Sequence, residues 1–243
     1  MMPQVPEPIV SLLLQHPIMR HVRASELRHL ATTNAVLHLD TGELLHAAGQ
    51  RADRIFVLLG GALQIEYPKP GEQRGPVIAI LQAPGLLGEC QVMHDRCWSG
   101  TGVALRSITA LGLHRETMEE LISGYPAFAL NVYRELTLRF LRAIEAWKHA
   151  PTVQPPERLA RYIISYLEAV DPQVQHNEVA LRQTELGRAT DLRRETINRL
   201  LRKWEAEKRL TIQREGLSAI KRHRLQELLG DNQRTLTQEV DLP

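Results

Sequence analysis

The 243-residue chain lacks the features that mark several common protein classes. It has 2 cysteines, Cys90 and Cys97, which are too few for the disulfide framework of a secreted protein, so we expect a cytoplasmic location. No stretch approaches the ~18 consecutive apolar residues of a membrane span, and the N-terminus has neither a basic stretch nor a small-residue cleavage site. The sequence therefore predicts no signal peptide and no membrane partner.

Catalytic motifs are also missing. The chain contains no G-x-S-x-G and no P-loop. A metal-dependent enzyme built on a β-roll needs a cluster such as His-x-His followed by a carboxylate, but no His-x-His occurs, and His38 and His46 are eight residues apart. We expect that the protein is not an enzyme.

The composition is that of an ordinary globular protein, with 43% hydrophobic and 24% charged residues, and the length suits two domains. The net charge is only +2, but its distribution is uneven. Residues 155–229 hold 15 Lys/Arg against 11 Asp/Glu, and the rest of the chain holds 15 against 17. The excess of positive charge in the C-terminal third is compatible with a nucleic-acid partner.

Short β-rich runs separated by glycine extend from about Ala35 to Leu113. The stretch "RIFVLLGGALQIEY" contains two such runs around Gly60-Gly61, which predicts a hairpin there. No alternation of strands with helices is present. The pattern predicts an antiparallel, jelly-roll-like β-roll in residues 1–125.

The pattern changes at Pro126, where a long helix is expected. Its apolar positions recur at alternating spacings of three and four, with one polar member: Leu130, Tyr133, Thr137, Phe140, Ile144 and Trp147. This heptad seam either packs on the chain's own β-domain or pairs with a second copy, and we favour a dimerisation helix over 126–150. The prolines in "HAPTVQPPE" then indicate a hinge.

The C-terminal third predicts a winged helix-turn-helix over 151–230. Helices are expected at Arg158–Val170, Thr184–Thr190 and about Arg193–Lys208, followed by a small hairpin that turns at Glu215-Gly216. The polar tail, 231–243, is expected to be poorly ordered. The complete fold class is α+β: a β-roll, a long helix and a winged helix-turn-helix.

The third of these helices carries the residues that suit DNA. Arg194, Glu195 and Arg199 lie within about a turn and a half, where arginine can bind guanine and glutamate can accept from cytosine. The alternative is a solvated face with a Glu195–Arg199 ion pair. Flanking or phosphate contacts are expected from Thr184, Arg193, Thr196, Asn198, Arg202 and Lys203.

"RRETINRLLRKWE" resembles the recognition helix of the CRP/FNR family of bacterial transcription regulators, whose motif is R-E-T-[VI]-x-R. "TGELLHAAGQRADRIFVLLGGALQI", "PGLLGE" and "ERLARYIISYL" are similar to other family segments in the same order. The resemblance implies a homodimer that reads a TGTGA-like palindrome in double-stranded DNA, with RNA polymerase as a further partner. Asp191 and Arg193 stand where the family usually has a turn glycine and a capping serine, so we expect a slightly shifted helix start.

Cyclic-AMP-binding members of that family use a Gly-Glu pair, an Arg-Ser pair and a Thr-Ser pair. The corresponding places here hold Gly88 and Glu89, Trp98 and Ser99, and Ala143 and Ile144. Because a phosphate without a cation is costly to bury, the resemblance implies a degenerate pocket, no cyclic AMP binding and no cofactor.

The spacing C-x3-H-x2-C places Cys90, His94 and Cys97 in one loop. A zinc site normally needs four ligands, and no close fourth is evident, so no metal is expected. Two alternatives stay open: a redox-, haem- or other ligand-responsive regulator that uses this loop, and an effector-binding module without DNA binding. The second leaves Arg194 and Arg199 unexplained.

Overall fold

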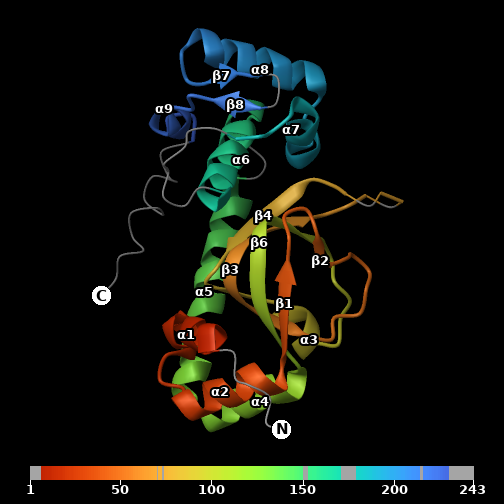
Figure 1. Cartoon of the computed structure of the whole chain (residues 1–243). Coiled ribbons are helices and arrows are strands. Elements are labelled where there is room, and N and C mark those ends of the chain that lie inside the picture. The colour runs from red at the N-terminus through yellow and green to blue at the C-terminus, as the bar shows by residue number, and fades with distance from the viewer. Residues whose placement is uncertain are drawn as a thin grey trace. The chain divides into compact units, whose positions relative to one another are not determined.

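The computed structural model describes residues 7–69, 71–72, 74–149, 153–170, 179–213 and 216–229, with the backbone alone for 142 and 145–149. The chain divides into two compact units (Figure 1). One holds residues 1–67 and 81–150, and the other holds 68–80 and 151–243. Each unit has its own hydrophobic core, one containing Phe128 and the other Trp204.

Three short helical segments, which were not predicted from the sequence, open the described part of the chain. They are α1 (Glu7–Gln15), the 3-10 helix η1 (Pro17–Met19) and α2 (Ala24–Thr33). Each buries apolar side chains, with Leu13 and Leu27 completely enclosed. Together with α4 (Arg115–Gly124) they lie at one end of the sheet (Figure 1).

The large β-sheet is antiparallel, which confirms the predicted α+β class and sheet type. Its central path runs β1–β6–β3–β4, with β2 paired to β6 and β5 paired to β3. The strands are β1 (Ala35–Leu39), β2 (Leu44–His46), β3 (Ile55–Glu66), β4 (Val77–Gln82), β5 (Gly85–Leu87) and β6 (Thr101–Leu113). Helix α3 (Glu89–Met93) interrupts them between β5 and β6.

The predicted hairpin at Gly60-Gly61 is wrong. Strand β3 continues through both glycines and pairs with β6 on each side of them, with register shifts between Leu58 and Leu63. Gly61 has φ +92°, and an added Cβ at this position would clash with the Ser107 carbonyl. The glycines therefore form an irregularity of the β-bulge type within one long strand rather than a turn between two.

Two helices complete the N-terminal unit: α4 and α5 (Pro126–His149). The predicted helix from Pro126 is confirmed, and its 24 residues follow Tyr125, the C-cap of α4. Phe128 and Val132 anchor its start in the core. In the described ranges no helix has the length and apolar character required to cross a membrane.

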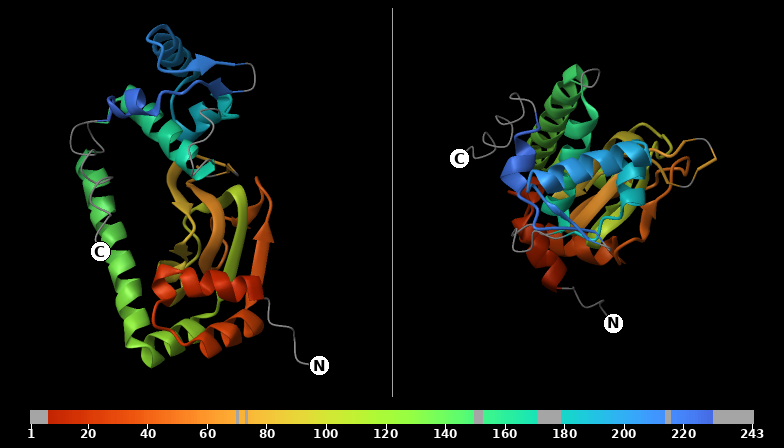
Figure 2. Two further views of the ribbon diagram at one scale, coloured as in Figure 1. Left: turned by 60° about the vertical axis from the view of Figure 1, so that its left-hand side comes forward. Right: turned by 90° about the horizontal axis from the view of Figure 1, so that it is seen from above.

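The C-terminal unit has the predicted order of helices and hairpin (Figure 2). Helices α6 (Pro155–Val170), α7 (Gln183–Thr190) and α8 (Arg194–Ala206) are followed by β7 (Thr211–Ile212), β8 (Leu217–Ser218) and α9 (Arg222–Gln226). Val179 adds a bridge to Leu217, and backbone hydrogen bonds of 2.8 and 2.9 Å join them. Glu215 of the expected turn and the tail after Leu229 lie outside the described residues.

Substitution of Gly61 by alanine is predicted to destabilise the β-roll by about 3 kcal/mol or more. The added Cβ would lie 2.2 Å from the Ser107 carbonyl oxygen and 2.8 Å from Ile108 Cα, and neither backbone atom can move freely. Gly42 is the matched control because it has the same φ of +92° but no atom within 4 Å of an added Cβ. Gly42→Ala should cost only about 1 kcal/mol. Equal free energies of unfolding in urea for the two variants would contradict the steric explanation.

Candidate DNA interface and effector pocket

The turn between α7 and α8 depends on Asp191. This residue ends α7 in the left-handed conformation, with φ 52° and ψ 36°, a geometry that aspartate tolerates better than most residues. Its carboxylate does not cap α8, because it pairs with Lys69 at 3.0 Å. Helix α8 begins at Arg194, and its N-cap, Arg193, makes no capping hydrogen bond through its side chain.

One side of α8 is firmly anchored. Its buried residues recur at helical spacing and belong to one core with α6 and the wing: Ile197, Leu200, Leu201 and Trp204. None of them is more than 3% exposed. Because these side chains cannot leave the core without losing apolar burial, the rotation of α8 about its axis is fixed.

The opposite side carries the predicted base-reading residues. Arg194, Glu195 and Arg199 are all exposed. No ion pair joins Glu195 to Arg199 or engages Arg194 within the part of the chain that the structure describes. The three side chains are therefore available to an external partner, and the interpretation of this face as an intrahelical ion pair receives no support.

The predicted flanking residues surround this face to different degrees. Arg193, Arg202 and Lys203 are exposed, as is Thr184 near the start of α7. Thr196 and Asn198 are half-buried. Lys203 approaches Glu207 at 3.8 Å, a loose surface pair that leaves its ammonium accessible.

In the N-terminal unit, Trp98 fills the place where the resemblance expects a phosphate-binding arginine. The indole is 5% exposed and stacks on His46, with ring centroids 3.8 Å apart and planes within 13°. The ring of Phe56 also stacks on the indole, with centroids 6.1 Å apart. Gly88 is required beside it, because a Cβ there would lie 2.7 Å from the indole. No sequence motif indicated that His46 and Phe56 lie in this pocket.

Glu89 is engaged by a residue that the sequence analysis missed. Arg139 of α5 donates to Glu89 Oε1 at 3.1 Å, to the Leu86 carbonyl at 2.5 Å and to Glu135 at 2.9 Å. Burial raises the pKa of Glu89, and the positive charge of Arg139 offsets only part of that effect. No motif indicated this pair, since its members lie fifty residues apart.

The other expected pocket residues do not converge on a polar site. Ser99 and Ala143 are exposed, and Ile144 is half-buried. Arg96, two residues before Trp98, is also exposed. Its backbone is held by hydrogen bonds to Gln91 and Ala52. Arg96 is the cationic residue closest in sequence to the expected phosphate-binding position, and its side chain faces solvent.

The predicted seam of α5 is largely uncovered in the single chain. Leu130, Tyr133 and Phe140 are 47, 63 and 64% exposed. Thr137 is half-buried, and its hydroxyl donates a hydrogen bond to the Tyr133 carbonyl at 2.9 Å. The side chain of Trp147 lies outside the described residues.

The loop with Cys90, His94 and Cys97 shows no assembled site. All three are exposed, and both cysteines are free thiols. Among the described residues no cluster of three or more His, Cys, Asp or Glu side chains is placed to hold a metal. Burial and the neighbouring Glu89 carboxylate raise the pKa of the Cys90 thiol, which disfavours the reactive thiolate.

A sheet domain followed by a helix-turn-helix with a wing and exposed arginines defines a DNA-binding regulator. Residues 36–125 match the cyclic nucleotide-binding domain, and residues 157–228 match the Crp-like helix-turn-helix domain. The chain belongs to the CRP/FNR family of transcription regulators. Its matches are to regulators and not to enzymes, as the sequence predicted.

Individual relatives are distant. The chain is 25% identical over 183 residues to the HTH-type transcriptional regulator Cmr of Mycobacterium tuberculosis, covering 75% of this chain and 71% of that protein. It is 20% identical over 196 residues to a CRP-like cAMP-activated global transcriptional regulator of the same species, covering 78% and 86%. The structure of a CRP/FNR-family transcriptional regulator from Thermus thermophilus superimposes with a TM-score of 0.65 at 16% identity, covering 80% and 97%.

The His46–Trp98 stack predicts a pH dependence of stability. Burial lowers the pKa of His46 from 6.5 to about 4. Because the folded state holds the proton less tightly than the unfolded chain, stability is present above pH ~6.5 and is lost as the pH falls towards ~4, by about 2–3 kcal/mol. His46→Phe keeps a stacking ring without a titrating group. It should lose less stability between pH 7 and pH 4.5 in urea unfolding than the parent protein.

The control is His38→Phe, which removes an exposed histidine of the same sheet. This variant should keep the pH dependence of the parent protein. If His46→Phe and His38→Phe behave alike, the buried stack is not the source of the effect.

Proposed function

We propose that the protein is a homodimeric transcription regulator that binds a TGTGA-like palindrome in DNA without cyclic AMP. The observation that carries this proposal is the set of exposed, unpaired side chains at the start of α8, within the described part of the chain: Arg194, Glu195 and Arg199. The proposal includes RNA polymerase as a partner, because activators that the sequence resembles contact it.

The chemistry of these three residues matches a half-site that contains G·C pairs. A guanidinium can donate two hydrogen bonds to O6 and N7 of guanine, and a carboxylate can accept from N4 of cytosine. The anchored side of α8 supports this use, because it keeps the three side chains on one face of the helix. Arg193, Arg202 and Lys203 supply positive charge for the flanking phosphates.

Dimerisation is supported by the exposed seam of α5. An isolated chain leaves Tyr133 and Phe140 more than half exposed, two turns apart on one helix. A second copy of the same helix would cover both rings. The two α8 helices of such a dimer must then lie about 34–36 Å apart to read successive major grooves.

Independence from cyclic AMP is supported by the side chains that occupy the expected nucleotide pocket, Trp98, Glu89 and Arg139. Trp98 brings no charge to the phosphate place, and Arg139 is already bound to Glu89 and the Leu86 carbonyl. A cyclic nucleotide would have to displace this ion pair and bury its phosphate without another cation, at a cost of several kcal/mol. The mycobacterial relative named as cAMP-activated thus gives no reason to assign that ligand here.

A fluorescence-anisotropy titration tests the proposal as a whole. The ligand-free protein should bind a TGTGA/TCACA palindrome at least ~10³-fold more tightly than a scrambled duplex at physiological salt, with no change on adding cyclic AMP. If binding required cyclic AMP, the proposed independence from the nucleotide would be contradicted. Equal, salt-sensitive binding to both duplexes would contradict the half-site.

Arg194→Met and Lys203→Met separate base reading from phosphate binding in that assay. Loss of a bidentate guanine contact should lower affinity for the palindrome by about 10- to 100-fold and leave binding to the scrambled duplex much less affected. Loss of the Lys203 ammonium should lower the affinity for both duplexes equally and reduce the salt dependence of binding. If the two variants lose selectivity for the palindrome equally, Arg194 does not contact the bases.

The double substitution Tyr133→Glu/Phe140→Glu is predicted to produce a monomer in sedimentation velocity. Opposed carboxylates would repel each other where two aromatic rings should pack. Leu14→Glu is the control, because Leu14 is 51% exposed on α1, outside the seam. That variant should remain dimeric. A dimeric double variant would show that α5 is not the interface.

A further inference from the structure

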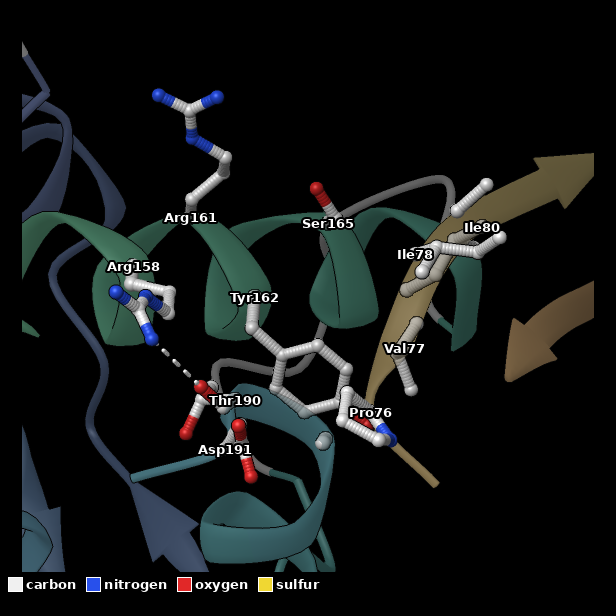
Figure 3. Close-up of a pocket in the computed structure, with 12 residues that line it drawn as sticks. Pro76, Val77, Ile78, Ile80, Arg158, Arg161, Tyr162, Ser165, Thr190 and Asp191 are labelled. Atoms are coloured by element: carbon white, nitrogen blue, oxygen red, sulfur yellow. Dashed lines mark hydrogen bonds between the residues drawn. The ribbon is translucent and has the colours of Figure 1, made fainter. Parts of the chain in front are cut away.

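The C-terminal unit contains a cavity of about 320 Å³ that the proposed DNA binding does not use. Its walls come from Pro76–Ile80, from α6 and from the end of α7 (Figure 3). The volume lies at the lower end of the range of about 300–1,000 Å³ that is usual for small-molecule sites. The cavity is therefore large enough for a compact organic ligand.

One wall is apolar. Val77, Ile78 and Ile80 belong to it, and Ile78 is 62% exposed although it is a large aliphatic side chain. The ring of Tyr162 projects from α6 between Pro76 and the end of α7 (Figure 3). This combination suits a flat or branched hydrocarbon body, which would gain free energy by removing these surfaces from water.

The opposite wall offers one cation that no carboxylate neutralises within the described ranges. Arg158 points towards the Thr190 carbonyl, at a long 3.4 Å (Figure 3). Arg161 pairs with Glu157 at 2.6 Å, and Asp191 pairs with Lys69 at 3.0 Å. Among the described residues, Arg158 is thus the charged group of this lining that makes no ion pair.

We propose that this cavity binds a small organic monoanion whose carboxylate pairs with Arg158 and whose apolar body packs on Tyr162 and the Val77–Ile80 segment. The charge of Arg158 selects the anion, because a guanidinium matches a carboxylate with two parallel hydrogen bonds. The hydroxyl of Ser165 provides a further polar group in the lining. The side chains of Val77, Ile78 and Ile80 offer no hydrogen-bond partner to a ribose, so a cyclic nucleotide fits less well.

The position of the cavity gives the ligand a role in regulation, and this consequence rests on the proposed function. Thr190 and Asp191 lead directly into α8, and Asp191 holds the Lys69 ammonium. A ligand that joins α6, the end of α7 and the Val77–Ile80 segment would stabilise that arrangement by mass action. The DNA affinity would then depend on the concentration of the anion.

Benzoate and hexanoate are the probes, and benzamide and hexanamide are their neutral counterparts. Isothermal titration calorimetry with the full chain and no DNA should give Kd values on the order of 1 mM for the acids, at least ~10-fold tighter than for the amides. Arg158→Gln should weaken the acids to the level of the amides. Ile78→Asp should abolish binding of both acids, because it places a like charge in the apolar wall.

Arg202→Gln is the matched control, since it removes an exposed arginine of the same unit outside the cavity and should leave acid binding unchanged. Unchanged thermal unfolding of Arg158→Gln would show that the variant is folded. The proposal is overturned if neither acid binds at about 10 mM, if the amides bind equally well, or if Arg158→Gln has no effect. Displacement of benzoate by cyclic AMP would make the cavity a nucleotide site and would also overturn it.

Fluorescence anisotropy measures binding to the palindrome with and without benzoate. It distinguishes a failure of the cavity proposal from a failure of the proposed function. Selective DNA binding without any binding of the acids refutes the cavity alone. Binding of the acids without selectivity for the palindrome refutes the proposed function alone.

Discussion

Burial of one side of α8 is the constraint on which the DNA interface depends. Exposing Trp204, now 1% exposed, would cost on the order of 3 kcal/mol, and Ile197 and Leu201 would be uncovered with it. Rotation of the helix is therefore far more costly than any surface ion pair could repay. As a result, Arg194 and Glu195 are held on the solvent side. The core supplies the orientation, and the exposed side supplies the chemistry.

Burial has a different effect in the β-roll, where it encloses stacked aromatic side chains. The Trp98 indole stands where the resemblance expects a phosphate-binding arginine, and it packs on His46, whose pKa is lowered by burial to about 4. An arginine at position 98 would instead need an anion nearby.

Local patterns predicted those elements whose chemistry is local. The helix-turn-helix follows from a contiguous motif, and Asp191 adopts the left-handed turn that its side chain permits. Gly60-Gly61 misled the prediction because a hairpin and a bulge share the same glycines, and only pairing with β6 over the whole length of β3 distinguishes them. Arg139 could not be assigned because its partner, Glu89, is distant in sequence and is brought near by α5. Exposure of the α5 seam was likewise a question of packing.

The ion pair between Glu89 and Arg139 connects the start of α3 to the helix that carries the α5 seam. Both side chains are largely buried, 24 and 11% exposed for Arg139 and Glu89, and burial still raises the pKa of Glu89 despite the adjacent guanidinium. Such a pair adds little net stability, since desolvation offsets most of the attraction. Its contribution is positional, because it ties the start of α3 to α5 one residue before Phe140. The cavity proposed to bind an organic anion lies in the other unit, beside Thr190, and adjoins the turn into α8.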